Sequence, residues 1–238
     1  MVKLTCLLST YHDLPLLQGR LDNLLTQREV DMELIVIAQR GSMEWDIFNR
    51  WAEKFGTMPY SGHGFKRIET DGIPTLYDAW NMGIKIAEGE YLTNTNTDDR
   101  LYEGALQRMI DVLDNEPDVG VVYPDVDRVA TIDGEPFGTF TWAEGDIDVL
   151  LQGCFLGPMP MWRRSLHDEY GMFDEGMHSS GDYDFWLRLA KNGVKMKRID
   201  EPLGRYFDRK ESIEHREPIR TVWETANARR RYRDRVYE

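Results

Sequence analysis

The sequence has few cysteines and lacks a long apolar run. Cys6 and Cys154 are its two cysteines among 238 residues, which is typical of reduced, mostly buried thiols in a cytosolic protein. Near the start the most apolar stretch extends only over residues 4–8 before polar residues follow, which is too short for a signal peptide. No stretch approaches the roughly 18 apolar residues that a membrane-spanning helix requires. We therefore expect a cytoplasmic protein whose contact with a membrane could only be peripheral, at the inner face.

The sequence also lacks an excess of positive charge. It has 29 Lys and Arg against 42 Asp and Glu, a net charge of −13 and a pI of about 4.9. Because nucleic-acid binding depends on attraction to phosphates, this balance argues against a nucleic-acid partner. It does not exclude a small anionic ligand, since a metal ion and a few local Lys or Arg residues can offset the negative electrostatic field of the chain. With 41% hydrophobic and 30% charged residues, we expect a globular protein with a sizeable core.

In the first half of the chain, apolar strands alternate with helical patterns. Residues 2–10 and 33–38 are almost continuously apolar, which is typical of buried parallel strands. Leucines at helical spacing lie between them, after Asp13, a residue type that is favoured at N-caps. Further strands are expected at residues 65–68 and 119–123, each preceded by a helical pattern. This order predicts an α/β protein whose central sheet is mostly parallel and flanked by helices.

The second half has a different pattern. An Asp-Gly turn within residues 129–140 predicts a hairpin, and Pro136 would place its second strand at a sheet edge. A helix is expected after Ser180, followed by a short strand at residues 195–199. From Pro218 onward an apolar stripe marks a C-terminal helix. We therefore expect one domain with a smaller antiparallel part and a C-terminal helix.

Two adjacent carboxylates follow a strand that is expected at residues 90–95. Asp98 and Asp99 stand beyond the carboxyl end of that strand, where ligands collect in open α/β sheets. Paired carboxylates suit an oxygen-seeking divalent cation such as Mg²⁺ or Mn²⁺. We interpret this stretch as the place where a metal holds a diphosphate. The alternative is an Asp-rich turn, since Asp is a common turn residue.

Several motifs follow one another along the chain. They are an STY-ended first strand, ELIVIAQRGS, GEYL followed by TDDR, MWRRSLHDEYGMFDE and SGDYDFWLRL. Their combination resembles family 2 glycosyltransferases with the GT-A fold, over roughly residues 2–206. The resemblance implies a Rossmann-like GT-A domain at residues 1–215, with a nucleotide-sugar half (1–125) and an acceptor half (126–215). Residues 216–238 would form the C-terminal helix.

On the donor side, the resemblance implies roles for four residues. Thr10 and Tyr11 follow the first strand, where the family contacts the nucleotide base or ribose. Asp98 and Asp99 match the aspartate motif that binds the ribose and the divalent metal of a nucleoside-diphosphate sugar. The resemblance therefore implies that both carboxylates lie at the donor diphosphate, with Mn²⁺ or Mg²⁺ as the cofactor.

On the acceptor side, Asp182 matches the general base of the inverting members. An acceptor hydroxyl must lose a proton as it attacks, and the N-terminal edge of a helix favours the ionised form that a base needs. The alternative for Asp182 is an ordinary helix N-cap. Trp162 and Arg163 match the segment that lines the cleft behind the acceptor. Asp184, two residues after the base, would point elsewhere, to the sugar or a loop.

The sequence departs from the family pattern at three places. Gln39 stands where the family often carries acids, and it can donate and accept hydrogen bonds to a uracil, thymine or guanine base. Asn96 replaces the acid that usually opens the metal motif, so it would act as a neutral oxygen ligand or a ribose donor. Arg209 and Lys210 stand where many members carry a His, and they could neutralise the leaving diphosphate. We interpret His215 as a surface residue.

Together these patterns predict a metal-dependent inverting glycosyltransferase. It would move a sugar from a nucleoside-diphosphate sugar to a hydroxyl acceptor, in the synthesis of a cell-surface glycan. One alternative is a sugar nucleotidyltransferase, but such enzymes usually open with a Gly-rich phosphate loop, and residues 9–14 contain no Gly. The other is a non-catalytic sugar-binding module on the same fold, which Asn96 and Gln39 favour. The oligomeric state is left open.

Overall fold

The computed structural model describes residues 2–10, 13–27, 29–55, 64–72, 74–207, 209 and 213–233. The first half alternates strands and helices, as predicted. Its elements are β1 (Leu4–Ser9), α1 (Leu14–Leu24), β2 (Met32–Gln39), α2 (Met43–Phe55), β3 (Gly64–Thr70), α3 (Leu76–Ile86), β4 (Tyr91–Asn94), β5 (Asp99–Leu101) and α4 (Ala105–Asn115). The short strand β5, which begins inside the acid pair, is an element that the apolar pattern did not predict.

The second half contains the predicted hairpin and the C-terminal helix. Its elements are β6 (Val119–Val129), β7 (Pro136–Phe140), α5 (Ile147–Leu150), β8 (Met161–Arg163), α6 (Ser165–Tyr170), α7 (Gly181–Lys191), β9 (Lys195–Phe207), α8 (Ile213–Arg216) and α9 (Pro218–Arg233). Among the described strands β7 pairs only with β6, so it lies at an edge of the sheet, as predicted from Pro136. Across the described ranges, no helix has both the length and the apolar character needed to cross a membrane.

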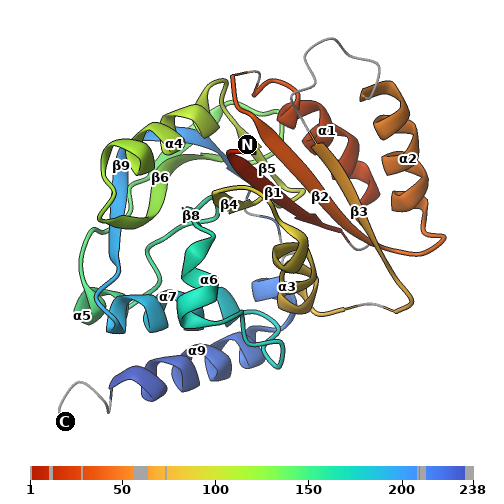
Figure 1. Ribbon diagram of the computed structural model, residues 1–238. Coiled ribbons are helices and arrows are strands. Elements are labelled where there is room, and N and C mark those ends of the chain that lie inside the picture. Colours follow the sequence, from red (N-terminus) through yellow and green to blue (C-terminus); the bar gives the residue numbers. More distant parts are fainter. Residues whose placement is uncertain are drawn as a thin grey trace.

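The nine strands that the described residues form belong to one mixed sheet, with helices on both faces (Figure 1). The strand order is β3-β2-β1-β4-β8-β6-β9-β5, and β7 extends from β6. Most of the paired residues lie in parallel ladders, which confirms the predicted α/β class. The antiparallel pairs join β8 to β4 and β6, β5 to β9, and β7 to β6. Because β1 lies between β2 and β4 with all three parallel, their carboxyl ends meet at one edge.

Two strands are longer than predicted. The sequence indicated strands at residues 119–123 and 195–199, whereas β6 continues to Val129 and β9 to Phe207. The two strands pair in parallel over this length, with register shifts, and the end of β9 also pairs with β5. These partners are distant in sequence, so local periodicity could not reveal them. The expected boundary between residues 125 and 126 lies inside β6.

The sheet separates two apolar cores. Along β1, Leu4, Cys6 and Leu8 pack into the core beneath α1, α2 and α4, whereas Leu7 packs into the core beneath α3, α6 and α7. Burial on both faces explains why the run has no polar alternation. Cys6 is fully buried and Cys154 is exposed, so the expectation of mostly buried thiols holds for Cys6 alone.

A buried carboxylate connects the first strands to the turn before β4. Glu33 accepts hydrogen bonds from the Thr5 hydroxyl (2.6 Å) and the Gly89 N–H (3.3 Å), and its other oxygen pairs with Lys66 Nζ at 2.7 Å. Burial favours a higher pKa, but the pairing with Lys66 and the hydrogen bonds from the Thr5 hydroxyl and the Glu88 N–H hold the pKa of Glu33 below its ordinary value. A Cβ atom at Gly89 would lie 2.4 Å from the backbone nitrogen of Thr5. Glycine is therefore required for β4 to approach β1 so closely.

Replacing Gly89 tests this close approach. In Gly89→Ala, β4 must shift away from β1, so we expect a loss of about 1–3 kcal/mol in the free energy of unfolding. Urea denaturation followed by circular dichroism measures it. Gly138→Ala is the matched control, because a Cβ there meets no atom within 4 Å. Equal stability of the two variants would contradict the packing argument.

Candidate active site

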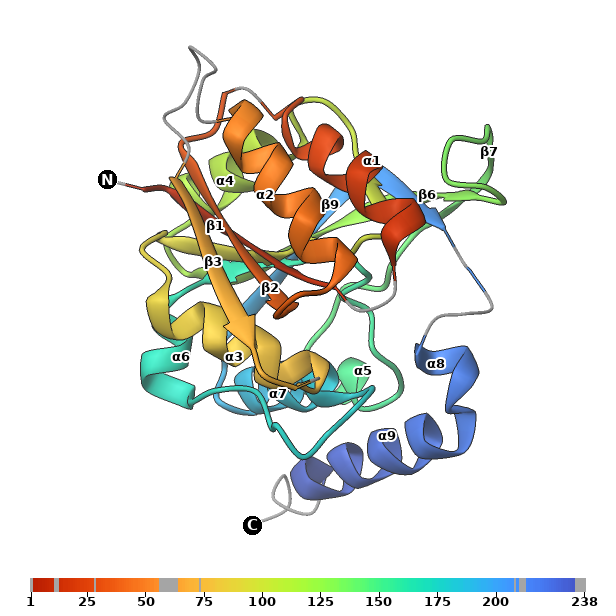
Figure 2. The same ribbon diagram turned by 90° about the vertical axis from the view of Figure 1, so that its right-hand side faces the viewer.

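A cleft of about 740 Å³ opens at the edge where β1, β2 and β4 end. Its walls include the ends of these strands, the start of α3, the start of α7 and residues of α8 and α9. Figure 2 shows α3, α7 and α8 below the lower ends of β1 and β2. Position and size suit a ligand-binding site, since open α/β sheets bind ligands beyond the carboxyl ends of their strands.

At one part of the cleft, polar side chains follow β1 and β2. Thr10 and the half-buried Gln39, for which the sequence predicts contacts with the donor, both line the cleft. The hydroxyl oxygen of Thr10 is buried and has no hydrogen-bond partner in the described part of the chain. Trp80 of α3 lines the same cleft and adds an aromatic face. Tyr11 lies outside the described residues.

Asp98 is the accessible carboxylate of the acid pair, and in this structure it binds an arginine. Arg209 Nε lies 2.9 Å from Asp98 Oδ2, and its Nη1 lies 2.9 Å from Asp13 Oδ1. The Thr97 hydroxyl donates to the other oxygen of Asp13 at 3.0 Å. Asp13 precedes α1 as predicted, but its side chain makes no cap bond and pairs with Arg209 instead.

Asp99 is almost fully buried beside Asp98. Its Oδ2 accepts a hydrogen bond from the Asn96 amide at 3.3 Å, whereas its Oδ1 has no partner in the described part of the chain. Burial and the charge of Asp98 raise the pKa of Asp99 well above its ordinary value, and the nearby Arg20 opposes this rise. A further cation bound beside Asp99, in addition to the charge of Arg20, would therefore stabilise the ionised form of Asp99.

The oxygen atoms at this edge of the cleft are suitable ligands for a hard divalent cation. The carboxylates of Asp98 and Asp99 and the amide oxygen of Asn96 are oxygen ligands of the type that Mg²⁺ and Mn²⁺ prefer. Within the described ranges, no group of three or more His, Cys, Asp or Glu side chains is arranged to hold a metal. The cation would therefore need further oxygen ligands from the phosphates of a molecule bound in the cleft or from water, which is usual for Mg²⁺ at phosphates.

Asp182 lies at the same cleft, in the first turn of α7. Its Oδ1 accepts hydrogen bonds from the Tyr77 hydroxyl at 2.8 Å and from the Tyr183 N–H at 2.9 Å. Burial raises the pKa of Asp182 above its ordinary value, and these hydrogen bonds oppose the rise. Ser180 is the N-cap residue of α7, so the alternative role of Asp182 as the N-cap is not observed.

The start of α7 is held by a carboxylate from the C-terminal helix. Glu224 of α9 is buried and accepts hydrogen bonds from the N–H groups of His178, Ser179 and Ser180, at 2.9–3.1 Å. Negative charge at a helix N-terminus is favourable because the backbone dipoles point the same way. The charge of Glu224 also contributes to the raised pKa of Asp182.

Two features of the cleft were missed by the sequence interpretation. Tyr77, which binds Asp182, lies on α3, 105 positions away along the chain, so only the fold brings the two together. Phe140 and Trp142 stack with their ring centroids 5.2 Å apart, and Tyr206 joins them at 5.9 Å from Phe140. All three aromatic rings line the cleft and offer apolar faces to a ligand.

Three predicted acceptor-side residues do not lie in the lining of the cleft. Trp162 and Arg163 belong to β8, a central strand, so Trp162 is fully buried and donates to His167 Nε2 at 2.9 Å. Arg163 donates to the Leu113 carbonyl at the end of α4. Asp184 is buried against α9, with Arg231 Nη1 at 3.0 Å. The side chains of these three residues therefore stabilise the fold, and the expectation that they contact the acceptor is not met.

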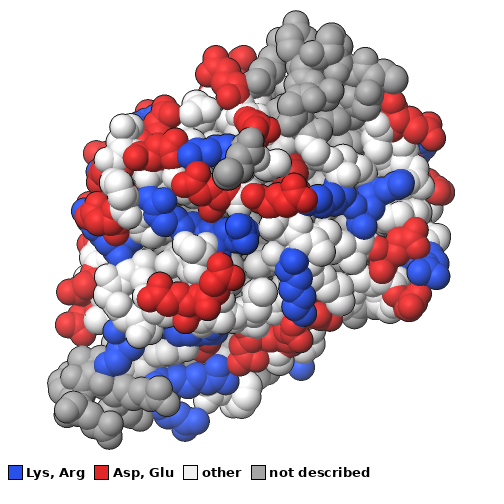
Figure 3. Space-filling model, viewed as in Figure 1, with Lys and Arg blue, Asp and Glu red and all other residues white. Residues whose placement is uncertain are grey.

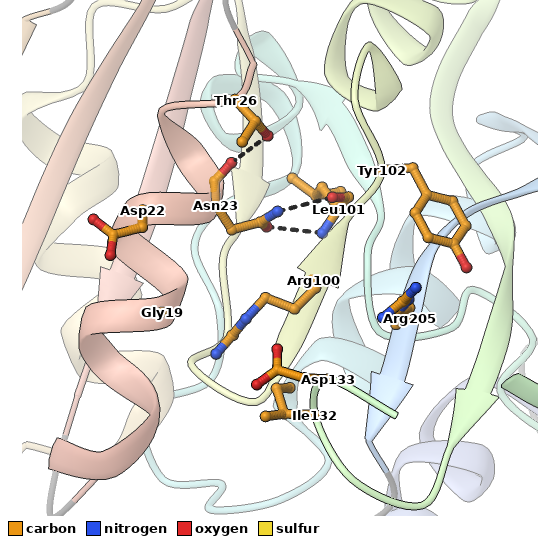
Figure 4. A pocket seen from close by; sticks show the side chains of 10 residues that line it. All are labelled: Gly19, Asp22, Asn23, Thr26, Arg100, Leu101, Tyr102, Ile132, Asp133 and Arg205. Carbon is orange, nitrogen blue, oxygen red and sulfur yellow. Dashed lines mark hydrogen bonds between the residues drawn. The ribbon is translucent and has the colours of Figure 1, made fainter. Parts of the chain in front are cut away.

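A second, smaller pocket of about 380 Å³ lies between α1, β5 and the β6–β7 turn (Figure 4). It contains the guanidinium groups of Arg100 and Arg205. Arg100 donates to the carbonyl oxygens of Thr97 (2.7 Å) and Leu16 (3.2 Å), so its hydrogen-bonding groups serve the fold. The larger cleft, which contains Asp98 and Asp182, is therefore the better candidate for the active site.

Comparisons with known proteins identify the family. The model of glycosyl transferase family 2 matches residues 5–145. The chain is 25% identical over 210 residues to an uncharacterized glycosyltransferase, YwdF, of Bacillus subtilis, covering 83% of this chain and 71% of that protein. It is 28% identical over 182 residues to a PGL/p-HBAD biosynthesis glycosyltransferase of Mycobacterium tuberculosis, covering 75% of this chain and 66% of that protein.

Solved structures share the fold. The S. aureus TarS structure in complex with UDP has a TM-score of 0.72 at 16% identity, covering 96% of this chain and 64% of that chain. The mannosyltransferase PcManGT from Pyrobaculum calidifontis, in complex with GDP-Man and Mn²⁺, has a TM-score of 0.69 at 19% identity. That match covers 92% of this chain and 60% of PcManGT, so the chain spans less than two thirds of both structures. Because the family model matches more than half of the sequence, the chain belongs to glycosyl transferase family 2 and is a glycosyltransferase.

Proposed function

We propose that this glycosyltransferase moves a sugar from a nucleoside-diphosphate donor to a hydroxyl group, with inversion and with a divalent cation. One observation carries the proposal: the acid pair Asp98 and Asp99 and the carboxylate of Asp182 line one cleft. The solved structures support the donor class, because TarS is described with UDP-GlcNAc and with UDP, and PcManGT with GDP-Man and Mn²⁺.

The donor would lie along the ends of β1, β2 and β4. We assign the nucleoside to Thr10, Tyr11, Gln39 and Asn96. Asp98 and Asp99 would hold Mn²⁺ or Mg²⁺. When bound, that cation would offset the charge that develops on the leaving diphosphate.

Arg209 would serve the leaving group as well. In the free chain its guanidinium is held between Asp13 and Asp98. A cation bound to Asp98 would compete with this arginine, because Arg209 already occupies one of the two oxygens of that carboxylate. Once released, the guanidinium carries donors that match phosphate oxygens. We therefore assign Arg209 to the diphosphate of the bound donor.

Asp182 would act as the general base. As the acceptor oxygen attacks the anomeric carbon, its proton passes to a carboxylate oxygen of Asp182, and the bond from that carbon to the diphosphate oxygen breaks. Burial makes the carboxylate a stronger base than an ordinary Asp, since it raises the pKa. Tyr77 would orient the carboxylate, and burial raises the pKa of Tyr77 well above its ordinary value, so the hydroxyl stays protonated.

For the acceptor we propose a glycan hydroxyl, in the synthesis of a cell-surface glycan. The stacked rings of Phe140 and Trp142 line the cleft and provide a flat apolar surface of the kind that packs on sugar rings.

Incubation with a panel of nucleotide sugars, with Mn²⁺ or with a chelator, tests the proposed function. Metal-dependent release of nucleoside diphosphate supports it. Pyrophosphate-dependent release of nucleoside triphosphate indicates a nucleotidyltransferase, and binding without turnover indicates a sugar-binding module.

Replacing the proposed base should separate binding from chemistry. Asp182→Asn retains the shape of the side chain but cannot accept the proton, so we expect donor affinity to persist and turnover to fall about a hundredfold or more. Calorimetry measures the first quantity and nucleotide release the second. Asp168→Asn, an exposed Asp in the first turn of α6, is the matched control. Turnover close to that of the control would assign the base elsewhere.

The Tyr77 hydroxyl should set the pH dependence of the reaction. Its hydrogen bond stabilises the ionised carboxylate and lowers the pKa of Asp182, so Tyr77→Phe should raise that pKa further. Because the base must be ionised, the acidic limb of the kcat/KM profile should move to higher pH. The loss of rate should therefore be larger below neutral pH than above it. An equal loss at every pH would indicate a purely structural role for Tyr77.

The cation requirement should depend on Asp98. In Asp98→Asn, the nucleoside diphosphate should bind about tenfold or more weakly with Mn²⁺ present, because one charged oxygen ligand is lost. With a chelator, wild type and variant should bind the nucleotide about equally. Titration calorimetry with UDP and GDP measures both conditions. Asp118→Asn, whose side chain is 69% exposed and pairs with Lys195 away from the cleft, is the control. Mn²⁺-dependent binding that survives in Asp98→Asn would remove this carboxylate from the metal site.

A further inference from the structure

The C-terminal helix α9 contacts the rest of the chain through its polar side. Glu224 caps the start of α7, and Arg231 pairs with Asp174 (2.9 Å) and Asp184 (3.0 Å). The one apolar side chain of α9 that is fully buried is that of Ala228, among the described residues. Hydrogen bonds and ion pairs therefore anchor this helix, rather than an apolar stripe.

The apolar stripe of α9 faces outward. Ile219, Val222 and Trp223 are 86%, 69% and 67% exposed, and Ala226 is exposed as well. Positions 219, 222, 223 and 226 have the i, i+3, i+4, i+7 spacing that places side chains on one face of a helix. A surface helix normally turns such a face toward the core. In α9 the usual arrangement is reversed, because the polar face meets the rest of the protein and the apolar face meets solvent. Within the described ranges this outer face has no apolar partner.

Exposed arginines stand at both ends of this stripe. Arg216 and Arg220 lie near its start, where Arg220 pairs with Glu217 at 2.7 Å, and Arg230 and Arg233 lie beyond its end. In Figure 2, α9 runs along the lower edge of the molecule with α7 above it, and in Figure 3 several Lys and Arg side chains appear at this lower edge. The local excess of positive charge contrasts with the net charge of −13 of the whole chain.

The charge pattern disfavours a second copy of the chain as the occupant of this face. A two-fold dimer brings the same surface of both copies together. Because arginines stand at both ends of the stripe, either direction of helix pairing would place arginines opposite arginines. An anionic surface, by contrast, complements both ends at once.

We propose that the outward face of α9 binds the surface of an anionic lipid bilayer. Ile219, Val222 and Trp223 enter the boundary between headgroups and acyl chains, where Trp is favoured, and the flanking arginines contact lipid phosphates. The acidic remainder of the molecule is repelled by the same surface, which orients the protein with α9 toward it. Thr221 and Thr225 of α9 line the cleft, so the bound bilayer lies beside the proposed active site.

Sedimentation with lipid vesicles tests this proposal without donor, acceptor or metal. The probes are vesicles of phosphatidylcholine alone and of phosphatidylcholine with phosphatidylglycerol in equal parts. We expect binding to the phosphatidylglycerol vesicles that weakens as salt is added, because salt screens the arginines. Trp223→Ser should weaken binding about tenfold or more, and the Arg230→Gln/Arg233→Gln double variant should weaken it severalfold at low salt.

Phe137→Ser is the matched control, because Phe137 is a 58% exposed aromatic side chain on β7, and it should bind like the wild type. Thermal unfolding confirms that each variant is folded. Three results would overturn the proposal: no binding to either vesicle, equal binding to both, or a lipid-free dimer that Trp223→Ser abolishes. Since nucleotide release is not the readout, a failure here leaves the proposed reaction untouched.

Discussion

The charge balance at the end of β1 and β4 is the constraint on which the site depends. Asp13, Asp98 and Asp99 gather there, and like charges held together in a partly buried place destabilise one another unless a cation offsets them. Arg209 provides that cation by bonding to Asp13 and Asp98. Asp99 keeps an oxygen without a partner in the described part of the chain, and its pKa is raised well above the ordinary value. We therefore propose that a divalent cation can replace Arg209 at this site.

The fold brings this charge cluster close to the proposed base. β1 lies between β2 and β4, and the glycine at position 89 allows the close approach of backbone that this pairing needs. From the other side of the cleft, α7 presents Asp182, and its first turn is held by Glu224 of α9. The C-terminal helix thus supports the base with its inner face, while its outer face is proposed to meet a bilayer.

The sequence predicted the parts of the molecule that depend on local patterns. The apolar runs of β1 and β2 and the paired carboxylates of Asp98 and Asp99 are visible in short stretches, and the motif order pointed to the family. The bond from Tyr77 to Asp182, the pairing of Arg209 with Asp13 and the length of β9 arise from contacts between distant segments. Burial of Trp162 could not be predicted either, because it follows from the central place of β8 in the sheet. The stripe of α9 was recognised, but periodicity alone does not tell which face of a helix meets the core.

The replacement of Arg209 by a divalent cation at Asp98 is tested most directly by the position of Mn²⁺ in a crystal that contains the nucleoside diphosphate. Anomalous scattering from manganese locates the ion without reference to the protein. We predict a single strong peak beside Asp98, with the guanidinium of Arg209 no longer bonded to that carboxylate. A manganese peak elsewhere, or bound nucleotide with the pair of Arg209 and Asp98 intact, would contradict the account.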